Sequence, residues 1–85
     1  MNINLHKLTN LPVHTESGQK LGKVYDLEID IDTHNVQRYL VRNNILSAKF
    51  FLIQNSQIKS ISDEKIVVYD AALLNLAKAD IAPEE

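Results

Sequence analysis

Four acidic residues at alternate positions are the first candidates for chemistry in this sequence. They are Asp26, Glu28, Asp30 and Asp32. On a strand, side chains two positions apart lie about 6.5–7 Å from each other, within the roughly 5–9.5 Å that two carboxylates need for glycoside hydrolysis. Catalytic carboxylates also need a pocket that shifts their pKa values, and a small β-barrel is filled by its own side chains. We therefore interpret them as a solvated strand face, neutralised in part by Arg38 or Arg42 across a hairpin.

This candidate polar face consists of Asp26, Glu28, Asp30, Arg38 and Arg42, and we predict no catalytic residue in it.

The segment Asp30–Asn35 begins with Asp-x-Asp, as a calcium-binding loop does. However, the glycine of such a loop is absent, and its twelfth position, a glutamate in calcium loops, is Val41. A hairpin turn explains the same residues without an ion.

Other residue types give no support to metal binding or catalysis. His6, His14 and His34 lie in separate segments, and none forms an i, i+4 pair. The absence of Cys excludes disulfides, zinc knuckles and thiol catalysis. No serine lies in a Gly-x-Ser-x-Gly motif, and two glycines are too few for a phosphate-binding loop. We therefore expect a protein without enzyme activity, metal or cofactor.

The net charge and the length of the chain limit the remaining classes of partner and location. Lys20 and Lys23 form a candidate basic patch with Arg38 and Arg42, but a formal net charge of −2 argues against nucleic acid as the partner. A chain of 85 residues fits a single domain over residues 1–85 with a thin core. No signal peptide is apparent, and the longest apolar run, Phe50–Ile53, is far shorter than the about 20 residues of a membrane span. We expect no direct membrane insertion and a cytoplasmic location.

Turn-forming residues recur at short intervals and separate six segments that have strand patterns. These segments are Pro12–Thr15, Leu21–Asp32, Val36–Asn43, Lys49–Gln54, Gln57–Ile61 and Ile66–Tyr69. In the second segment, apolar residues at positions 25, 27, 29 and 31 alternate with the four acids, so we expect one buried and one solvated face. Short strands joined by tight turns predict an all-β fold, a six-stranded and mostly antiparallel barrel over about residues 8–70.

Only the C-terminal region has a helical pattern. Asp70 is a candidate N-cap, and Leu73, Leu76 and Ala77 share one helix face. The pattern predicts a short α-helix at about residues 71–79, followed by an acidic tail at 80–85. Because two or three turns do not persist alone in water, this helix must pack on the barrel or on another chain.

The opening strands resemble the PRC-barrel domain family, which is found in the photosynthetic reaction centre and in the C-terminal half of ribosome maturation factors. The resemblance rests on Leu11–Thr15 and on Ser17–Leu27, which contains Leu-Gly-x-Val-x-Asp-Leu, and then on the acidic alternation and Val36–Val41. A later isoleucine series, at positions 58, 61 and 66, also fits. The family often has Gly after the third strand, where this chain has Asn43-Asn44. The resemblance implies a stand-alone PRC barrel whose work is to hold other proteins.

A second candidate site is apolar. In Phe50–Ile53, alternation places Phe50 and Leu52 on one face and Phe51 and Ile53 on the other, so one pair needs a cover outside the barrel. The candidate partner interface is Ile45, Leu46, Phe50, Phe51, Leu52 and Ile53. We predict a protein-binding scaffold module that forms a homodimer or docks a larger protein partner. The alternative, by analogy with the maturation factors, is an accessory factor in RNA processing or ribosome assembly.

Overall fold

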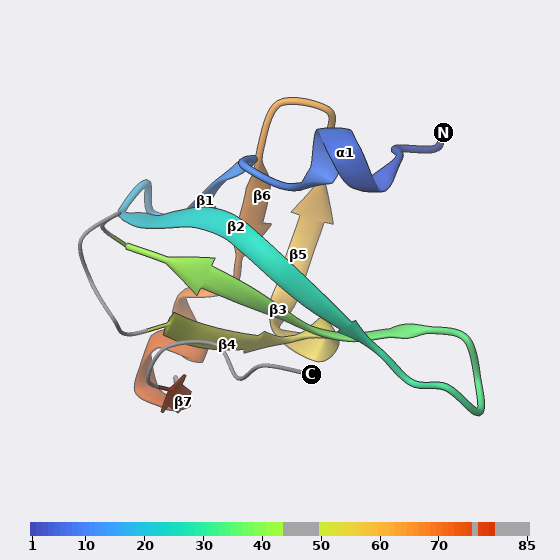
Figure 1. The fold of residues 1–85 in the computed structure, drawn as a ribbon. Helices are drawn as coiled ribbons and strands as arrows, with labels where there is room; N and C mark the ends of the chain where they lie inside the picture. Colours follow the sequence, from blue (N-terminus) through green and yellow to red (C-terminus); the bar gives the residue numbers. More distant parts are fainter. Residues whose placement is uncertain (44–49, 76, 80–85) are drawn as a thin grey trace.

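The computed structural model describes residues 1–43, 50–75 and 77–79. In chain order, the elements are α1 (Leu5–Leu8), β1 (Pro12–Thr15), β2 (Lys20–Ile29), β3 (Val36–Arg42), β4 (Phe50–Gln54), the 3₁₀ helix η1 (Asn55–Gln57), β5 (Ile58–Ile61), β6 (Ile66–Val68), the 3₁₀ helix η2 (Asp70–Asn75) and β7 (Ala77–Ala79). The strands of this part form one sheet in the order β5-β6-β1-β2-β3-β4-β7 (Figure 1). The predicted all-β class is therefore confirmed, and all six predicted strands are present.

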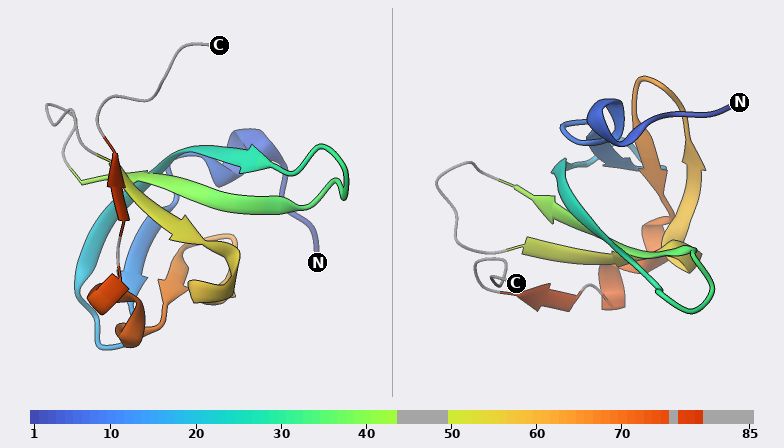
Figure 2. Two further views of the ribbon diagram at one scale, coloured as in Figure 1. Left: turned by 90° about the horizontal axis from the view of Figure 1, so that it is seen from below. Right: turned by 45° about the vertical axis from the view of Figure 1, so that its right-hand side comes forward.

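The sheet differs from the predicted barrel in two respects. Strand β1 pairs with β6 in parallel, whereas every other pair in the described residues is antiparallel, so the sheet is mixed. Its described part ends at β5 on one side and at β7 on the other, so it is open and not closed. Figures 1 and 2 show a strongly bent sheet, in which β5 and β6 run at a steep angle to β3 and β4. The bend follows two bulges in β2, at Leu21 in its ladder with β1 and at Tyr25 in its ladder with β3, which increase local twist.

The core fills the concave side of this bend. Six side chains from five strands are almost fully buried: Val13, Val24, Val41, Ile53, Ile66 and Val68. Leu8 of α1 and Leu11 join the same cluster, and α1 itself begins where the Asn4 side chain accepts a hydrogen bond from the Lys7 N–H at 2.8 Å. Each valine or isoleucine buried in this way stabilises the fold by about 1.5–3 kcal/mol relative to an exposed position.

The predicted C-terminal α-helix at residues 71–79 is wrong. Residues Asp70–Asn75 form a 3₁₀ helix, and Ala77–Ala79 add a strand to the edge of β4. The Asp70 carboxylate accepts hydrogen bonds from the backbone N–H and hydroxyl of Ser17, and pairing with β4 replaces the continuation of the helix. Ala72 is buried and Leu73 half-buried against the core. Leu76 and the predicted acidic tail at 80–85 lie outside the described residues.

The expectation that the apolar residues of β2 share one buried face is wrong for three of the four. Tyr25 is 46% exposed, Ile29 56% and Ile31 86%, while Leu27 is half-buried. The bulge between Val24 and Asp26 changes the face that Tyr25 occupies. The β2–β3 hairpin then extends beyond the rest of the sheet (Figures 1 and 2), so Ile29 and Ile31 have no core beneath them.

None of the helices in the described part of the chain has both the length and the apolar character needed to cross a membrane.

Gly22 marks a place where two strands approach more closely than a side chain allows. Its φ is +143°, and an added Cβ would lie 2.3 Å from the backbone oxygen of Arg42. We predict that Gly22→Ala lowers the free energy of unfolding by about 2 kcal/mol or more, because both the backbone conformation and the strand spacing must change. Gly18→Ala is the matched control, since Gly18 also has a positive φ of +100° but open space around it. Urea unfolding measures the free energy of unfolding of both variants. Equal decreases for Gly22→Ala and Gly18→Ala would contradict the close-approach explanation.

A polar cluster ties the β1–β2 turn to the C-terminal region. The Glu16 carboxylate accepts a hydrogen bond from the Asp70 N–H at 3.0 Å and pairs with the Lys59 ammonium at 3.2 Å. The Asp70 N–H, followed by Lys59, holds the pKa of the Glu16 carboxyl below its ordinary value of 4.5. Ionised Glu16 therefore stabilises the folded state above that ordinary pKa, and this contribution is lost as the pH falls through the lowered folded-state pKa.

We predict that Glu16→Gln is less stable than the wild type near pH 7 and that the difference disappears towards about pH 3. The measurement is urea unfolding of both proteins across this pH range. Asp63→Asn removes one exposed carboxylate in the β5–β6 turn and serves as the control. A difference between Glu16→Gln and the wild type that stays constant with pH would contradict the assignment.

Candidate functional site

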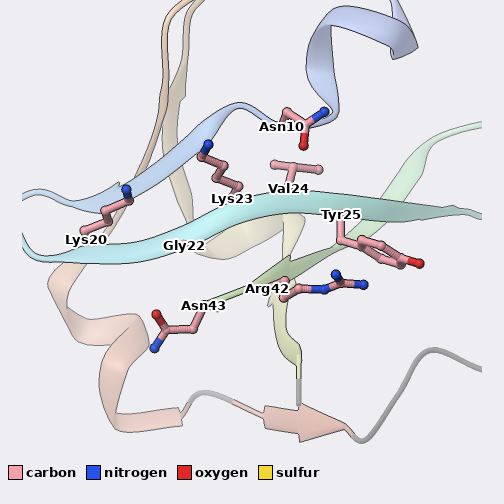
Figure 3. Close-up of a pocket in the computed structure, with 8 residues that line it drawn as sticks. All are labelled: Asn10, Lys20, Gly22, Lys23, Val24, Tyr25, Arg42 and Asn43. Carbon is pink, nitrogen blue, oxygen red and sulfur yellow. The ribbon is translucent and has the colours of Figure 1, made fainter. Parts of the chain in front are cut away.

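A pocket of about 270 Å³ lies where the loop after α1 crosses β2 and where β3 ends. Its lining residues are Asn10, Lys20, Gly22, Lys23, Val24, Tyr25, Arg42 and Asn43 (Figure 3). The loop is held in place by two backbone hydrogen bonds, from the Asn10 N–H to the Val24 oxygen at 2.8 Å and from the Val24 N–H to the Leu11 oxygen at 2.9 Å. The backbone beside the pocket is therefore hydrogen-bonded, and the cationic and aromatic side chains of the lining project from β2 and β3.

Three cationic side chains surround this pocket. Lys23 of β2 is directly opposite Arg42 of β3 in the antiparallel ladder, and Lys20 lies at the start of β2. Figure 3 shows the two lysine side chains directed away from β2, while the Arg42 guanidinium lies along the Tyr25 ring. Within the described residues, none of the three forms an ion pair. No acidic residue in the described part of the chain lines the pocket, so the electrostatic character of these lining residues is positive.

Arg42 is held by aromatic rings. Its guanidinium carbon lies 4.0 Å from the centroid of the Tyr25 ring and 5.4 Å from that of Phe50. The two rings are themselves 5.0 Å apart and tilted by 42°. The Arg42 Nε is buried, and no acceptor for it lies in the described part of the chain. The ring faces therefore supply the favourable electrostatic environment that a carboxylate would otherwise provide.

The acidic part of the predicted polar face is engaged in local structure. Glu28 pairs with Arg38 across the β2–β3 ladder, which is the cross-strand neutralisation expected for one of the two arginines. The Asp26 carboxylate accepts from the Leu27 N–H, and Asp30 accepts from the N–H groups of Asp32 and Thr33 in the hairpin turn. In residues 1–43, 50–75 and 77–79, no group of three acidic or histidine side chains is close enough to hold a metal ion.

Comparison with known proteins is consistent with this geometry. A family model described as the PRC-barrel domain matches residues 1–74. The chain belongs to the PRC-barrel family. The match extends the predicted resemblance over residues 8–70 to include α1 and most of η2. A search of curated proteins finds no match.

In this PRC-barrel domain, the predicted alternation of the apolar run is present. Phe51 and Ile53 pair with Val41 and Tyr39 on the core side of the sheet, whereas Phe50 and Leu52 pair with Arg42 and Leu40 on the other side. Phe50 and Ile53 are buried, and Phe51 and Leu52 are half-buried. Ile45 and Leu46, the other two members of the candidate interface, lie outside the described residues.

Tyr25 is the functional candidate that sequence reasoning missed. Strict alternation assigns it to the buried face, and only the bulge beside it brings it next to Arg42 and Phe50. The signal available in the sequence is weak: Gly22 predicts an irregularity in this strand but not its position. The structure thus joins one residue of the predicted polar face, Arg42, to one residue of the predicted apolar interface, Phe50.

The aromatic contacts of Tyr25 give a stability prediction. Tyr25→Leu removes the ring that stacks on Arg42 and Phe50, so the free energy of unfolding is expected to fall by about 1 kcal/mol. Tyr69→Leu is the matched control, because Tyr69 has a similar exposure, 43% against 46%, and no aromatic contact within the described residues. Its expected change lies within about 0.5 kcal/mol. Equal losses in urea unfolding would show that the stack does not stabilise the domain.

Proposed function

We propose that this PRC-barrel domain is a non-enzymatic protein-binding module that docks a partner through the surface formed by Tyr25, Arg42 and the pocket beside them. The observation that carries the proposal is the stacked pair of Arg42 and Tyr25, at 4.0 Å, in which Tyr25 is 46% exposed and Arg42 is half-buried. Tyrosine and arginine are the residue types enriched, with tryptophan, at the energetic centres of protein interfaces. The stacking orders the arginine before binding, which reduces the entropy that association costs.

The apolar run Phe50–Ile53 supports this surface from beneath. Phe50 is buried and contacts the Arg42–Tyr25 pair from β4. The module therefore binds by shape and apolar complementarity, with the Phe50 ring as a rigid base and Tyr25 as the accessible apolar contact. This arrangement suits a larger protein partner or a second copy of the chain, and the cytoplasm remains the predicted location.

Several features favour binding over catalysis. The side chains of Glu28 and Asp30 already have partners in an ion pair and a turn. Among the described residues, the pocket is lined by no carboxylate or histidine, the residue types that most often act as general acid or base.

The alternative, an accessory role in RNA processing or ribosome assembly, has one supporting observation. Lys20, Lys23 and Arg42 surround a pocket for which the described residues supply no acidic side chain, and such a local patch attracts phosphates even on an acidic protein. RNA binding that weakens steeply with salt would favour this alternative, and its absence at low salt would exclude it.

A photo-crosslinking amino acid at position 25 tests the protein-binding function in cells. We expect covalent adducts of defined mass from Tyr25 and none from the same group at Lys65, which is exposed in the β5–β6 turn. After identification of the adduct by mass spectrometry, Arg42→Ala should weaken binding of the purified partner by about tenfold or more. Lys65→Ala should leave that affinity unchanged. Adducts from neither position, or equally from both, would contradict the proposal.

A further inference from the structure

The charges of the β2–β3 hairpin are separated along its length. The end nearest the pocket carries three cations and no acid: Lys20, Lys23 and Arg42. The far end carries four acids and one arginine: Asp26, Glu28, Asp30, Asp32 and Arg38. With His34 neutral, the two ends have formal charges of +3 and −3. Tyr25 lies at the boundary between them. The two strands of the hairpin form a ribbon, which spans the ten residues of β2.

The surface of this ribbon is accessible. Lys20, Lys23, Asp26, Glu28 and Asp32 are all exposed. Three apolar side chains lie among them with large exposed fractions, Tyr25 at 46%, Ile29 at 56% and Ile31 at 86%. On this projecting hairpin (Figure 1), the exposed apolar groups offer contact area between charges that can orient a partner.

One backbone edge of the same hairpin lacks a neighbouring strand among the described residues. Strand β1 pairs with β2 only as far as Lys23, and the preceding loop adds hydrogen bonds only at Val24. From Tyr25 to Ile29, β2 has β3 on one side, and no other described strand pairs with it on the second side. Because β1 and the loop occupy this side of β2 as far as Val24, this edge cannot align the basic end of one hairpin with the acidic end of another. Association of whole hairpins therefore uses the face of the ribbon that carries Lys23, Tyr25 and Glu28.

We propose that the partner of this surface is a second copy of the chain, and that two β2–β3 hairpins associate antiparallel about a two-fold axis next to Tyr25. The inference rests on the proposed protein-binding function and names its partner. In a two-fold interface, each patch meets its counterpart on the other copy. Antiparallel association therefore places the basic end of each hairpin against the acidic end of the other.

The charge pattern selects this arrangement among the possible ones. Formal charges of +3 and −3 match at both ends of an antiparallel pair, whereas a parallel pair would place like charges together at both ends. The same antiparallel pair brings the two Tyr25 rings together at its centre.

The size of the ribbon sets the strength of the dimer. Ten residues at about 3.3 Å each and two strands at about 4.8 Å give a face of roughly 320 Å² for each copy. A stable interface buries about 800 Å² for each partner. We therefore expect a weak dimer with a dissociation constant above about 1 µM. Because exposed charges carry much of the attraction, dimerisation should weaken as salt shortens the screening length below about 8–10 Å.

Charge reversal provides the test. Sedimentation equilibrium of the wild type between about 10 µM and about 1 mM at low salt should reveal the dimer. The basic-end variant Lys20→Glu/Lys23→Glu and the acidic-end variant Asp26→Lys/Asp32→Lys should each raise the dissociation constant by about tenfold or more. Mixed in equal amounts, they should associate with each other more tightly than either does with itself. One pair of ends in the mixed dimer keeps charges of −3 and +3 and the other has −1 and +1, whereas each variant alone places like charges together at both ends. Lys65→Glu, which changes the net charge away from the hairpin, should leave dimerisation unchanged.

The outcomes distinguish failure of the second-copy proposal from failure of the proposed protein-binding function. A wild type that stays monomeric throughout, or a mixture of variants that fails to associate although both are folded by urea unfolding, overturns the second-copy proposal. Crosslinks from Tyr25 to a different protein then still support the protein-binding function. Crosslinked species from Tyr25 with twice the mass of the chain support both. Loss of dimerisation with Lys65→Glu as well would show that net charge, and not the hairpin, controls association.

Discussion

The close contact between Gly22 and the backbone of Arg42 is the constraint on which the rest of the structure depends. A Cβ at position 22 would lie 2.3 Å from the Arg42 oxygen, so β2 and β3 hold this spacing only because the position has no side chain. The contact fixes Lys23 opposite Arg42 and Val24 opposite Val41. One side of the ladder therefore fills the core, while the other presents cations beside an exposed tyrosine. A single backbone approach thus sets both the stability and the electrostatic character of the site.

Strand β2 divides into two parts with different roles. Its first part lies between β1 and β3 and contributes Val24 to the core, whereas its second part continues beyond β1 as half of a projecting hairpin. Because the folding free energy comes from burial in the first part, the second part can carry exposed isoleucines and carboxylates without loss of the core. The polar contacts among Glu16, Lys59 and Asp70 close the opposite side of this small domain.

Much of the fold could be predicted from the sequence, but less of the site. Alternation located six strands, and the Leu-Gly-x-Val-x-Asp-Leu segment indicated the family. The same alternation assigned Tyr25 to the buried face, because a bulge shifts the parity of a strand without leaving a clear mark in the sequence. The C-terminal helix failed for a related reason: Asp70 binds Ser17, far away in the chain, and residues 77–79 pair with β4.

The sequence by itself determined what local physics controls: the strands and turns, the exclusion of thiol and disulfide chemistry, and the separation of apolar from polar residues along each strand. Only the tertiary structure decided which apolar residues are covered and which charges meet. It left the sheet open, paired Glu28 with Arg38, and placed Arg42 against Tyr25 and Phe50. These contacts join strands distant in the chain, and their energies depend on register and bulges, which periodicity alone cannot specify.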